Sequence, residues 1–300
     1  MQQSQTNLRG ILAMMLAMLV FTGNDALMKY ARASLETGQA LVVRGLFCVV
    51  LLAMAVVLTR NVARLPLALS RFALLRAGLE GAIATLYIGA LAGIALAEAT
   101  AITMLAPLLI TAASTLFLGE KVGWRRWSAI AVGFVGILLV LRPEGRVVPA
   151  WAVAMVFGCT LLIALRDVLT RRMPNHVPSL MLTVATSCGT LVAGSILAWR
   201  SGNWQPMPPD VLIALGGAAV LVLIGNYAVI EAHRGTDLSV VSPFRYSVIG
   251  WAVIVGFVMF GDVPSPVAMG GLALILASGL YTIHRERLRR RAEREALPPA

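Results

Sequence analysis

Charged residues are scarce in this chain of 300 residues: Asp, Glu, Lys and Arg make up 13% of it, whereas apolar residues (AVILMFWYC) make up 59%. Soluble domains are usually about 45–50% apolar and about 25% charged. The composition therefore excludes an ordinary water-soluble enzyme. Cysteine is scarce too, and Cys48, Cys159 and Cys188 lie inside apolar blocks without C-x-x-C spacing. Neither a zinc site nor an extracellular disulfide framework is expected.

The motifs of membrane enzymes and ATP-driven pumps are missing. The chain has no H-E-x-x-H, G-x-S-x-G, G-x-x-x-x-G-K-[ST] or G-x-G-x-x-G segment, and its three histidines lie far apart. Each motif supplies a metal ligand set, a nucleophile or a phosphate-binding loop that its chemistry requires. The chain is therefore not expected to be an enzyme or to bind a cofactor or metal ion, and an integral membrane enzyme is the disfavoured alternative. A channel is disfavoured as well, because such a pore needs a ring of like residues from several subunits.

Apolar blocks of about 20 residues recur along the chain, and this is the length that a helix needs to cross about 30 Å of hydrocarbon. Blocks such as residues 130–141 do not alternate between apolar and polar residues, so they are not strands of a membrane barrel. The pattern predicts an all-α integral membrane protein with ten transmembrane helices. They are expected at residues 8–28, 39–59, 72–93, 98–118, 125–142, 150–170, 178–199, 211–231, 239–260 and 266–284.

The basic residues indicate how these helices are oriented. If both termini lie in the cytoplasm, the inner loops and the tail hold sixteen Lys and Arg residues and the outer loops hold five. Cytoplasmic loops of membrane proteins carry an excess of Lys and Arg. We therefore predict a multi-pass protein with both termini in the cytoplasm, where residues 285–300 form a basic tail. The net charge of +11 then reflects orientation in a lipid bilayer, and no nucleic-acid partner is expected.

The two halves of the chain match each other weakly at an offset of 142 residues. The superimposed pairs are Asp25 and Asp167, Lys29 and Arg171, and Gly119-Glu120 and Gly261-Asp262. Residues 1–146 and 147–284 would then hold five helices each. Since five is an odd number, the second half enters the membrane inverted relative to the first. Inverted repeats are typical of secondary transporters, which bind their substrate near the membrane midplane between the repeats.

Two segments of the chain resemble the EamA-type members of the drug/metabolite transporter superfamily. They are residues 98–120 and 239–262, in which the fourth helix of each half ends in Gly-Glu or Gly-Asp. The resemblance covers essentially the whole chain. It implies a central cavity enclosed by the first four helices of each half, and transport of a small organic metabolite across the bacterial inner membrane by alternating access.

Residues 164–172 and 243–246 further resemble the bacterial branch that contains riboflavin and S-adenosylmethionine uptake proteins. This resemblance implies uptake of riboflavin as the first expectation. Uptake of S-adenosylmethionine, and export of amino acids or other metabolites, stay open as alternatives. The sequence is compatible with a homodimer.

Polar and aromatic residues within the spans are the candidates for solute binding. A charged side chain at the centre of a span costs about 2.5–3.5 kcal/mol on insertion scales, so it normally faces a cavity or an oppositely charged partner. An arginine in the cavity could bind carbonyl or carboxylate groups of the solute, and an aromatic ring could stack on a flat solute. The candidates are Arg44, Tyr87, Asn226, Tyr227, Arg245, Tyr246 and Trp251.

Three pairs of charged residues stand four positions apart, the spacing at which side chains meet on a helix. The pairs are Arg76 and Glu80, Asp25 and Lys29, and Asp167 and Arg171. We expect the first to be an internal ion pair and the other two to be salt bridges at helix ends. Glu80 and Glu98 are also the candidates for coupling proton movement to transport, since both carboxylates lie within or beside a span.

Two prolines are predicted to interrupt helices that correspond in the two halves. They are Pro107 and Pro243. A proline inside a helix removes one backbone hydrogen bond and frees a carbonyl group. We therefore regard both prolines as hinge candidates, and a tolerated kink is the alternative.

Overall fold

The computed structural model describes residues 2–109, 124–141, 148–171, 178–233 and 241–295. Within these residues all the regular secondary structure is helical. The helices are α1 (Gln2–Arg32), α2 (Thr37–Leu58), η1 (Val62–Leu69), α3 (Arg71–Ala90), α4 (Leu96–Thr103), α6 (Trp124–Val140), α7 (Ala150–Arg171), α8 (Ser179–Ser201), α9 (Pro209–His233), η2 (Ser242–Tyr246), α11 (Ser247–Phe260) and α12 (Pro266–Glu295).

Within the described part of the chain, eight helices are long and apolar enough to cross a membrane. Two shorter apolar helices, Leu96–Leu109 and Trp127–Val140, fall within or beside the predicted spans 98–118 and 125–142. The remainder of the first of these spans lies outside the described residues, as does the Gly119-Glu120 motif. The prediction of an all-helical membrane protein is confirmed, and the count of ten helices stays a prediction.

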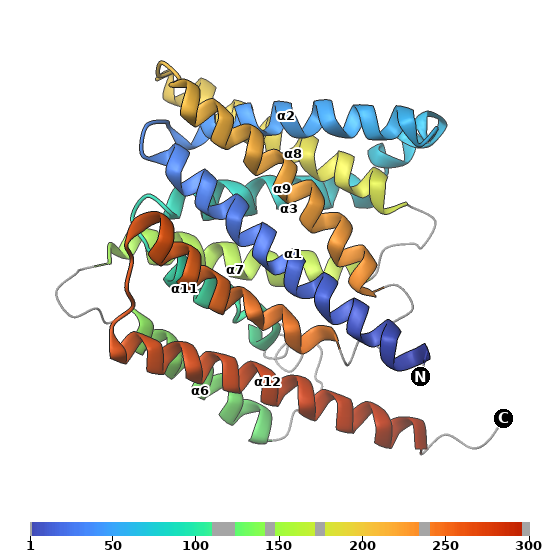
Figure 1. Cartoon of the computed structure of the whole chain (residues 1–300), viewed down its shortest axis with the longest axis vertical. Helices are drawn as coiled ribbons and strands as arrows, with labels where there is room; N and C mark the ends of the chain where they lie inside the picture. Colours follow the sequence, from blue (N-terminus) through green and yellow to red (C-terminus); the bar gives the residue numbers. More distant parts are fainter. Residues whose placement is uncertain (1, 110–123, 142–147, 172–177, 234–240, 296–300) are drawn as a thin grey trace.

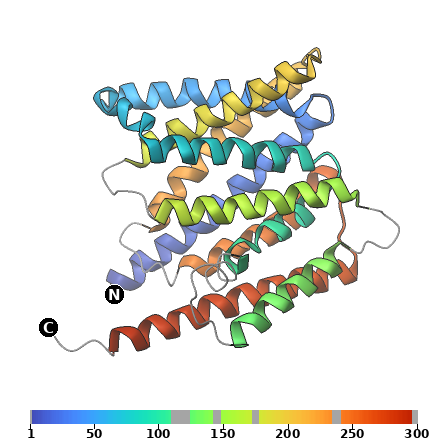
Figure 2. The ribbon, with the colours of Figure 1, turned by 180° about the vertical axis from the view of Figure 1, so that it is seen from behind.

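The helices form one bundle in which segments far apart in the sequence lie side by side (Figures 1 and 2). Helix α1 packs along α9, α2 along α8, α3 along both α7 and α8, and α6 along α12. Each of these contacts joins a helix from the first half of the chain to one from the second half. Burial of apolar side chains between the halves therefore provides most of the packing.

Glycines at the crossing points allow these helices to approach closely. A Cβ atom on Gly81 of α3 would lie 2.7 Å from the carbonyl oxygen of Gly189 on α8. A Cβ atom on Gly136 of α6 would lie 2.8 Å from the carbonyl oxygen of Gly271 on α12. Small residues at such points bring helix backbones into contact, which favours association where water no longer drives apolar surfaces together.

The bundle has two ends, which we name by the chain termini. The start of α1 and the end of α12 lie together at the terminal end (Figure 1). The opposite, distal end holds the last turn of α1 and the first turns of α2 and α7.

Candidate substrate-binding site

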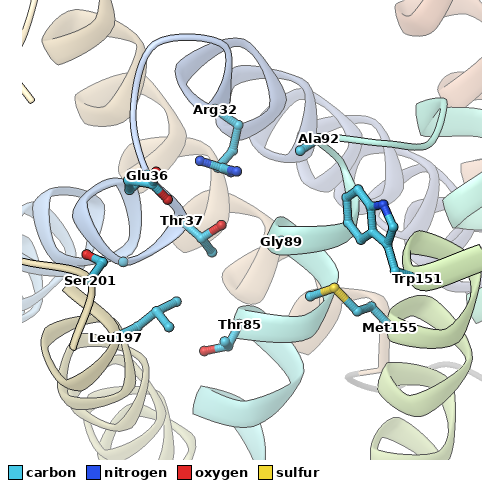
Figure 3. Close-up of a pocket in the computed structure, with 11 residues that line it drawn as sticks. Arg32, Glu36, Thr37, Thr85, Gly89, Ala92, Trp151, Met155, Leu197 and Ser201 are labelled. Carbon is cyan, nitrogen blue, oxygen red and sulfur yellow. The ribbon is translucent and has the colours of Figure 1, made fainter. Parts of the chain in front are cut away.

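A cavity of about 300 Å³ opens at the distal end of the bundle (Figure 3). This volume is at the lower limit of the range usual for small-molecule sites, about 300–1,000 Å³. The cavity lies between the ends of α1, α2, α3, α7 and α8. Its lining residues are Arg32, Glu36, Thr37, Gly38, Thr85, Gly89, Ala92, Trp151, Met155, Leu197 and Ser201.

A polar network deeper in the bundle, here called the Asp25 network, joins α1, α2, α3 and α4. The Asn24 side-chain amide donates to Asp25 Oδ1 at 2.9 Å, and Arg44 Nη1 of α2 donates to Asn24 Oδ1 at 3.3 Å. The Tyr87 hydroxyl of α3 also contacts the Asp25 carboxylate and lies 3.5 Å from Thr100 Oγ1 of α4. The network therefore brings together two predicted candidates, Arg44 and Tyr87, with three residues that were not predicted to bind solute.

The Asp25 network lies well inside the membrane-spanning part of the bundle. Asp25 precedes the end of α1 by seven residues, and Arg44 follows the start of α2 by seven residues. At 1.5 Å per residue, both lie about 10 Å from the distal ends of their helices, in a hydrocarbon layer of about 30 Å. Polar groups at this depth are normally functional, because burying them without a purpose is expensive.

Several buried side-chain donors have no hydrogen-bond partner among the described residues. Among them are Nε of Arg44, a member of the Asp25 network, and Nε1 of Trp251 on α11. A buried donor without an acceptor costs about 1–3 kcal/mol. Acceptor groups of a bound solute would remove this penalty at both atoms. Arg44 and Trp251 were both predicted as site residues, and whether they bind solute stays a prediction.

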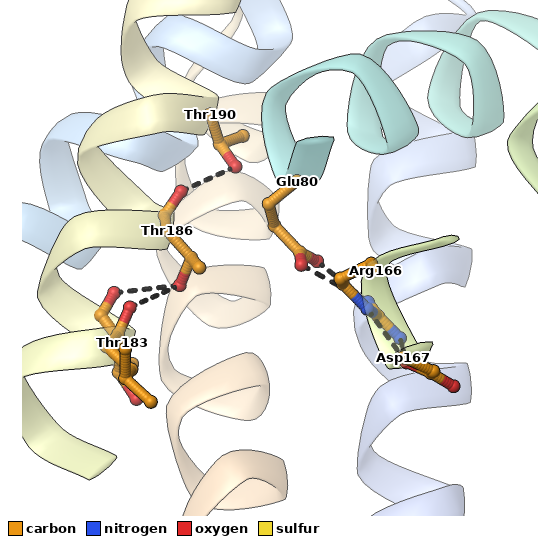
Figure 4. A network of polar contacts seen from close by, with 7 residues as sticks. Glu80, Arg166, Asp167, Thr183, Thr186 and Thr190 are labelled. Atoms are coloured by element: carbon orange, nitrogen blue, oxygen red, sulfur yellow. Dashed lines mark hydrogen bonds and ion pairs between the residues drawn. The ribbon is translucent and has the colours of Figure 1, made fainter. Parts of the chain in front are cut away.

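A second network, here called the Glu80 network, joins α3 to α7 (Figure 4). The Arg166 guanidinium lies between two carboxylates, with Nη1 at 3.2 Å from Glu80 Oε2 and Nη2 at 2.9 Å from Asp167 Oδ1. The Arg166 side chain is only 16% exposed. The carboxylate of Glu80 is thus held by an arginine from the other half of the chain, a partner that its four-residue spacing from Arg76 does not indicate.

Threonines of α8 lie on the other side of Glu80 (Figure 4). The hydroxyls of Thr186 and Thr190 donate to carbonyl oxygens one turn earlier in α8, each at 3.0 Å. Their hydrogens are therefore used within the helix, and only their oxygen lone pairs are available to other groups.

One of the two predicted helix-end salt bridges differs from the prediction. Lys29 Nζ does not pair with Asp25; it lies 2.9 Å from Asp262 Oδ2, after the end of α11, and 4.4 Å from the centre of the Phe260 ring. Asp167 pairs with Arg166, and the side chain of its predicted partner Arg171 lies outside the described residues. The partner of Lys29 is 233 positions away and was available only through the fold, whereas the pairing of Asp167 with Arg171 stays a prediction.

Three predicted site residues lie away from the Asp25 network. Tyr227 is 65% exposed and belongs to the outward stripe of α9, where Ile213, Val220 and Ile224 are also exposed, so it faces lipid and not the cavity.

Arg245 of η2 is exposed. Tyr246 is buried and its ring contacts the position of Gly279 on α12, so it packs between helices. Asn226 is half-buried on α9, and a role in the site stays a prediction for it.

Glu98 and the two prolines mark irregular segments of the bundle. The Glu98 carboxylate accepts a hydrogen bond from the Ala95 backbone N–H at 3.0 Å and so caps the start of α4. Pro107 follows the end of α4 at Thr103, and Pro243 stands at the start of η2, directly before α11. Both prolines thus lie beside a break in a helix, and their role as hinges stays a prediction.

The sequence of this chain is similar to those of known proteins. The model of the EamA-like transporter family matches residues 8–142 and again 150–283. A riboflavin transporter of Rhizobium johnstonii is 28% identical over 74% of this chain and 72% of its own length. A riboflavin transporter of Vibrio cholerae is 29% identical over 66% of this chain and 65% of its own length.

A more distant relative and one solved structure match nearly the full length. An S-adenosylmethionine uptake transporter of Rickettsia conorii is 24% identical over 94% of this chain and 95% of its own length. A crystal structure with 20% identity covers 95% of this chain and 99% of its own, with a TM-score of 0.57, which indicates a shared fold.

Proposed function

The chain belongs to the EamA-like transporter family, within the drug/metabolite transporter superfamily, and from this membership we propose that it is a secondary carrier for riboflavin uptake. The family and its named relatives are transporters and not enzymes. Together with the membrane-spanning helices, they place the chain among multi-pass metabolite transporters of the bacterial inner membrane. What we propose beyond family membership is the substrate, the direction in which it moves and the mechanism of transport.

The carrier consists of two inverted halves, residues 1–146 and 147–284. The family model matches once in each half, which supports this division. The packing supports it as well: exchanging α1 with α7 and α3 with α9 turns the α1–α9 contact into the α7–α3 contact, and both are present. The same symmetry exchanges α2 with α8 and α6 with α12. It therefore leaves the α2–α8 contact and the α6–α12 contact unchanged, and both are present. Such an arrangement allows the two halves to open alternately to each side of the membrane.

The terminal end of the bundle faces the cytoplasm. The excess of Lys and Arg in the predicted inner loops supports this orientation. The start of α1 and the end of α12 lie at one end, as an even number of spans requires (Figure 1). The distal end, with its cavity, then faces the outside of the inner membrane, which is the side from which uptake begins.

The solute binds between the Asp25 network and Trp251. The observation that carries this proposal is that two buried donors, Nε of Arg44 and Nε1 of Trp251, have no hydrogen-bond partner within the part of the chain that the structure describes. Riboflavin has a flat, neutral ring system with carbonyl oxygens that could accept from both donors and a face that could stack on an indole. The acidic group of the network, Asp25, lies beside Asn24 and near the Arg44 charge, so the site does not present a lone anion.

The charge balance favours riboflavin over S-adenosylmethionine. A cationic solute requires a carboxylate that is not already engaged. Within the described side chains, Glu80 is paired with Arg166, and Glu98 caps α4. The side chain of Glu231, a third carboxylate that could serve a cation, lies outside the described residues. Uptake of S-adenosylmethionine is therefore the second candidate, supported by the names of the Rickettsia relatives.

Uptake into whole cells tests the substrate. Bacterial cells that can neither make nor import riboflavin should accumulate labelled riboflavin when they express this chain, and a tenfold excess of unlabelled S-adenosylmethionine should not compete. Expression of the Arg44→Ala variant provides the matched control. Accumulation of labelled S-adenosylmethionine without riboflavin would move the substrate to the second candidate. Accumulation of neither, with increased resistance to amino acids, would favour export.

A further inference from the structure

The distal cavity is separate from the Asp25 network, although both use α3. Thr85 and Gly89 line the cavity, whereas Tyr87, between them in the sequence, reaches the network. Residues two apart on a helix point about 200° apart, so the two sites lie on different faces of α3. The cavity is therefore not an extension of the proposed site around Arg44 and Trp251.

One wall of the cavity is an aromatic and thioether surface from α7. Trp151 stands in the first turn of α7 and is 50% exposed, with its ring directed toward the cavity (Figure 3). A Cβ atom on Gly93 would lie 2.7 Å from the indole Cζ2 atom, so glycine at this position leaves room for the ring. A Cβ atom on Gly89 would lie 2.6 Å from Cε of Met155, one turn further along α7. The two side chains thus pack against the last turn of α3 and the turn that follows it.

The opposite wall carries charges that balance. The Arg32 guanidinium donates through Nη1 to the Leu35 carbonyl oxygen, which holds its plane, while its Nε is buried without a partner among the described residues. Glu36 is close enough to interact electrostatically with Arg32. The cavity lining therefore holds one cation and one anion, and it carries no strong net charge.

Hydroxyl groups complete the lining. Thr85 Oγ1 donates to the Gly81 carbonyl oxygen at 2.9 Å, and Ser201 Oγ donates to the Ala198 carbonyl oxygen at 3.0 Å. Because their hydrogens are used, both oxygens serve the cavity as acceptors. An indole face, a guanidinium beside a carboxylate and hydroxyl acceptors together suit a flat, uncharged molecule that carries both carbonyl and hydroxyl groups.

We propose that this cavity is a second solute-binding site, which holds the flat, neutral solute at the outer surface before it moves to the Asp25 network. This inference rests on the proposed uptake of riboflavin. The solute would stack on Trp151, accept a hydrogen bond from the Arg32 guanidinium, and donate hydrogen bonds from its hydroxyl groups to Thr85 and Ser201. If the site only captures solute, its loss should change the KM for solute uptake more than the Vmax.

Initial rates of riboflavin uptake, normalised to protein abundance, test this site. Trp151→Ala should raise KM about tenfold and leave Vmax within about twofold, because stacking and one aromatic wall are lost while the Asp25 network is intact. Arg32→Gln should raise KM severalfold, and Trp151→Phe should stay close to the wild type. Trp199→Ala is the matched control, since Trp199 is a tryptophan near the same end, 84% exposed and outside the cavity lining.

Two outcomes overturn the second site. Trp151→Ala and Arg32→Gln with wild-type KM would show that the cavity binds no solute on the path, and equal KM changes in Trp151→Ala and Trp199→Ala would show a general membrane effect. If Trp151→Ala fails to accumulate in the membrane, the KM of Arg32→Gln tests the site in its place. A wild-type chain without riboflavin uptake would instead refute the proposed substrate, so the two failures are distinguishable.

Discussion

Arg166→Gln is expected to lower the midpoint of thermal unfolding by about 10 °C and to abolish transport. The substitution removes the cation that lies between the carboxylates of Glu80 and Asp167. Breaking a buried ion pair by removing one partner typically costs about 3–5 kcal/mol, because the remaining charge is left uncompensated. For a chain of this size, each kcal/mol corresponds to roughly 2–4 °C.

The unfolding midpoint can be measured on detergent-solubilised protein by size-exclusion chromatography after heating. Arg200→Gln is the matched control, because Arg200 is exposed at the end of α8 and should change the midpoint by no more than about 2 °C. Adding Glu80→Gln to Arg166→Gln should recover part of the stability, since it removes one of the two carboxylates that lost the Arg166 cation. A wild-type midpoint for Arg166→Gln would mean that the Glu80 network does not stabilise the bundle.

Arg44→Ala is expected to reduce riboflavin uptake at least tenfold at normal protein abundance. The variant loses the buried Nε donor and the hydrogen bond from Nη1 to Asn24, so the solute loses a partner and the Asp25 network loses its cation. Arg44→Lys should restore only part of the activity, because lysine keeps the charge but not the planar set of donors.

A substitution on the lipid-facing surface provides the control for Arg44→Ala. Tyr227→Phe removes a polar atom from the same membrane-spanning bundle, but at an exposed position on α9. Its uptake rate should match that of the wild type. If Arg44→Ala transports at the wild-type rate per molecule, or if Tyr227→Phe loses as much activity, the site around Asp25 is wrong.

The membrane fold was predictable because its determinants are local. The length of each apolar block and the charges that flank it set which segments can span a bilayer, and both are visible in the sequence.

The pairing of α1 with α9 was not predictable in the same way. Helical periodicity shows that one face of a helix carries small or apolar residues. It does not show which other helix that face contacts. Gly225, for example, is one of many glycines, and only the structure places it against Phe21.

The site was predictable in part. Asp25 and Asp167 were identified by the offset between the halves, but their partners were inferred from four-residue spacing, which detects only contacts within one helix. Arg166 binds Asp167 from the adjacent position and reaches Glu80 across a helix boundary. Tyr227 shares its helical phase with the exposed Ile213, Val220 and Ile224, so the sequence pattern itself indicates its outward direction.

Counterflow in reconstituted vesicles tests the central claim, that this chain is an alternating-access carrier of riboflavin. Vesicles that contain the purified protein and are preloaded with unlabelled riboflavin should transiently accumulate labelled riboflavin above its external concentration. Protein-free vesicles should not do so. Equilibration without such an overshoot would indicate a channel, and the absence of any labelled riboflavin in vesicles that hold folded protein would contradict the proposed substrate.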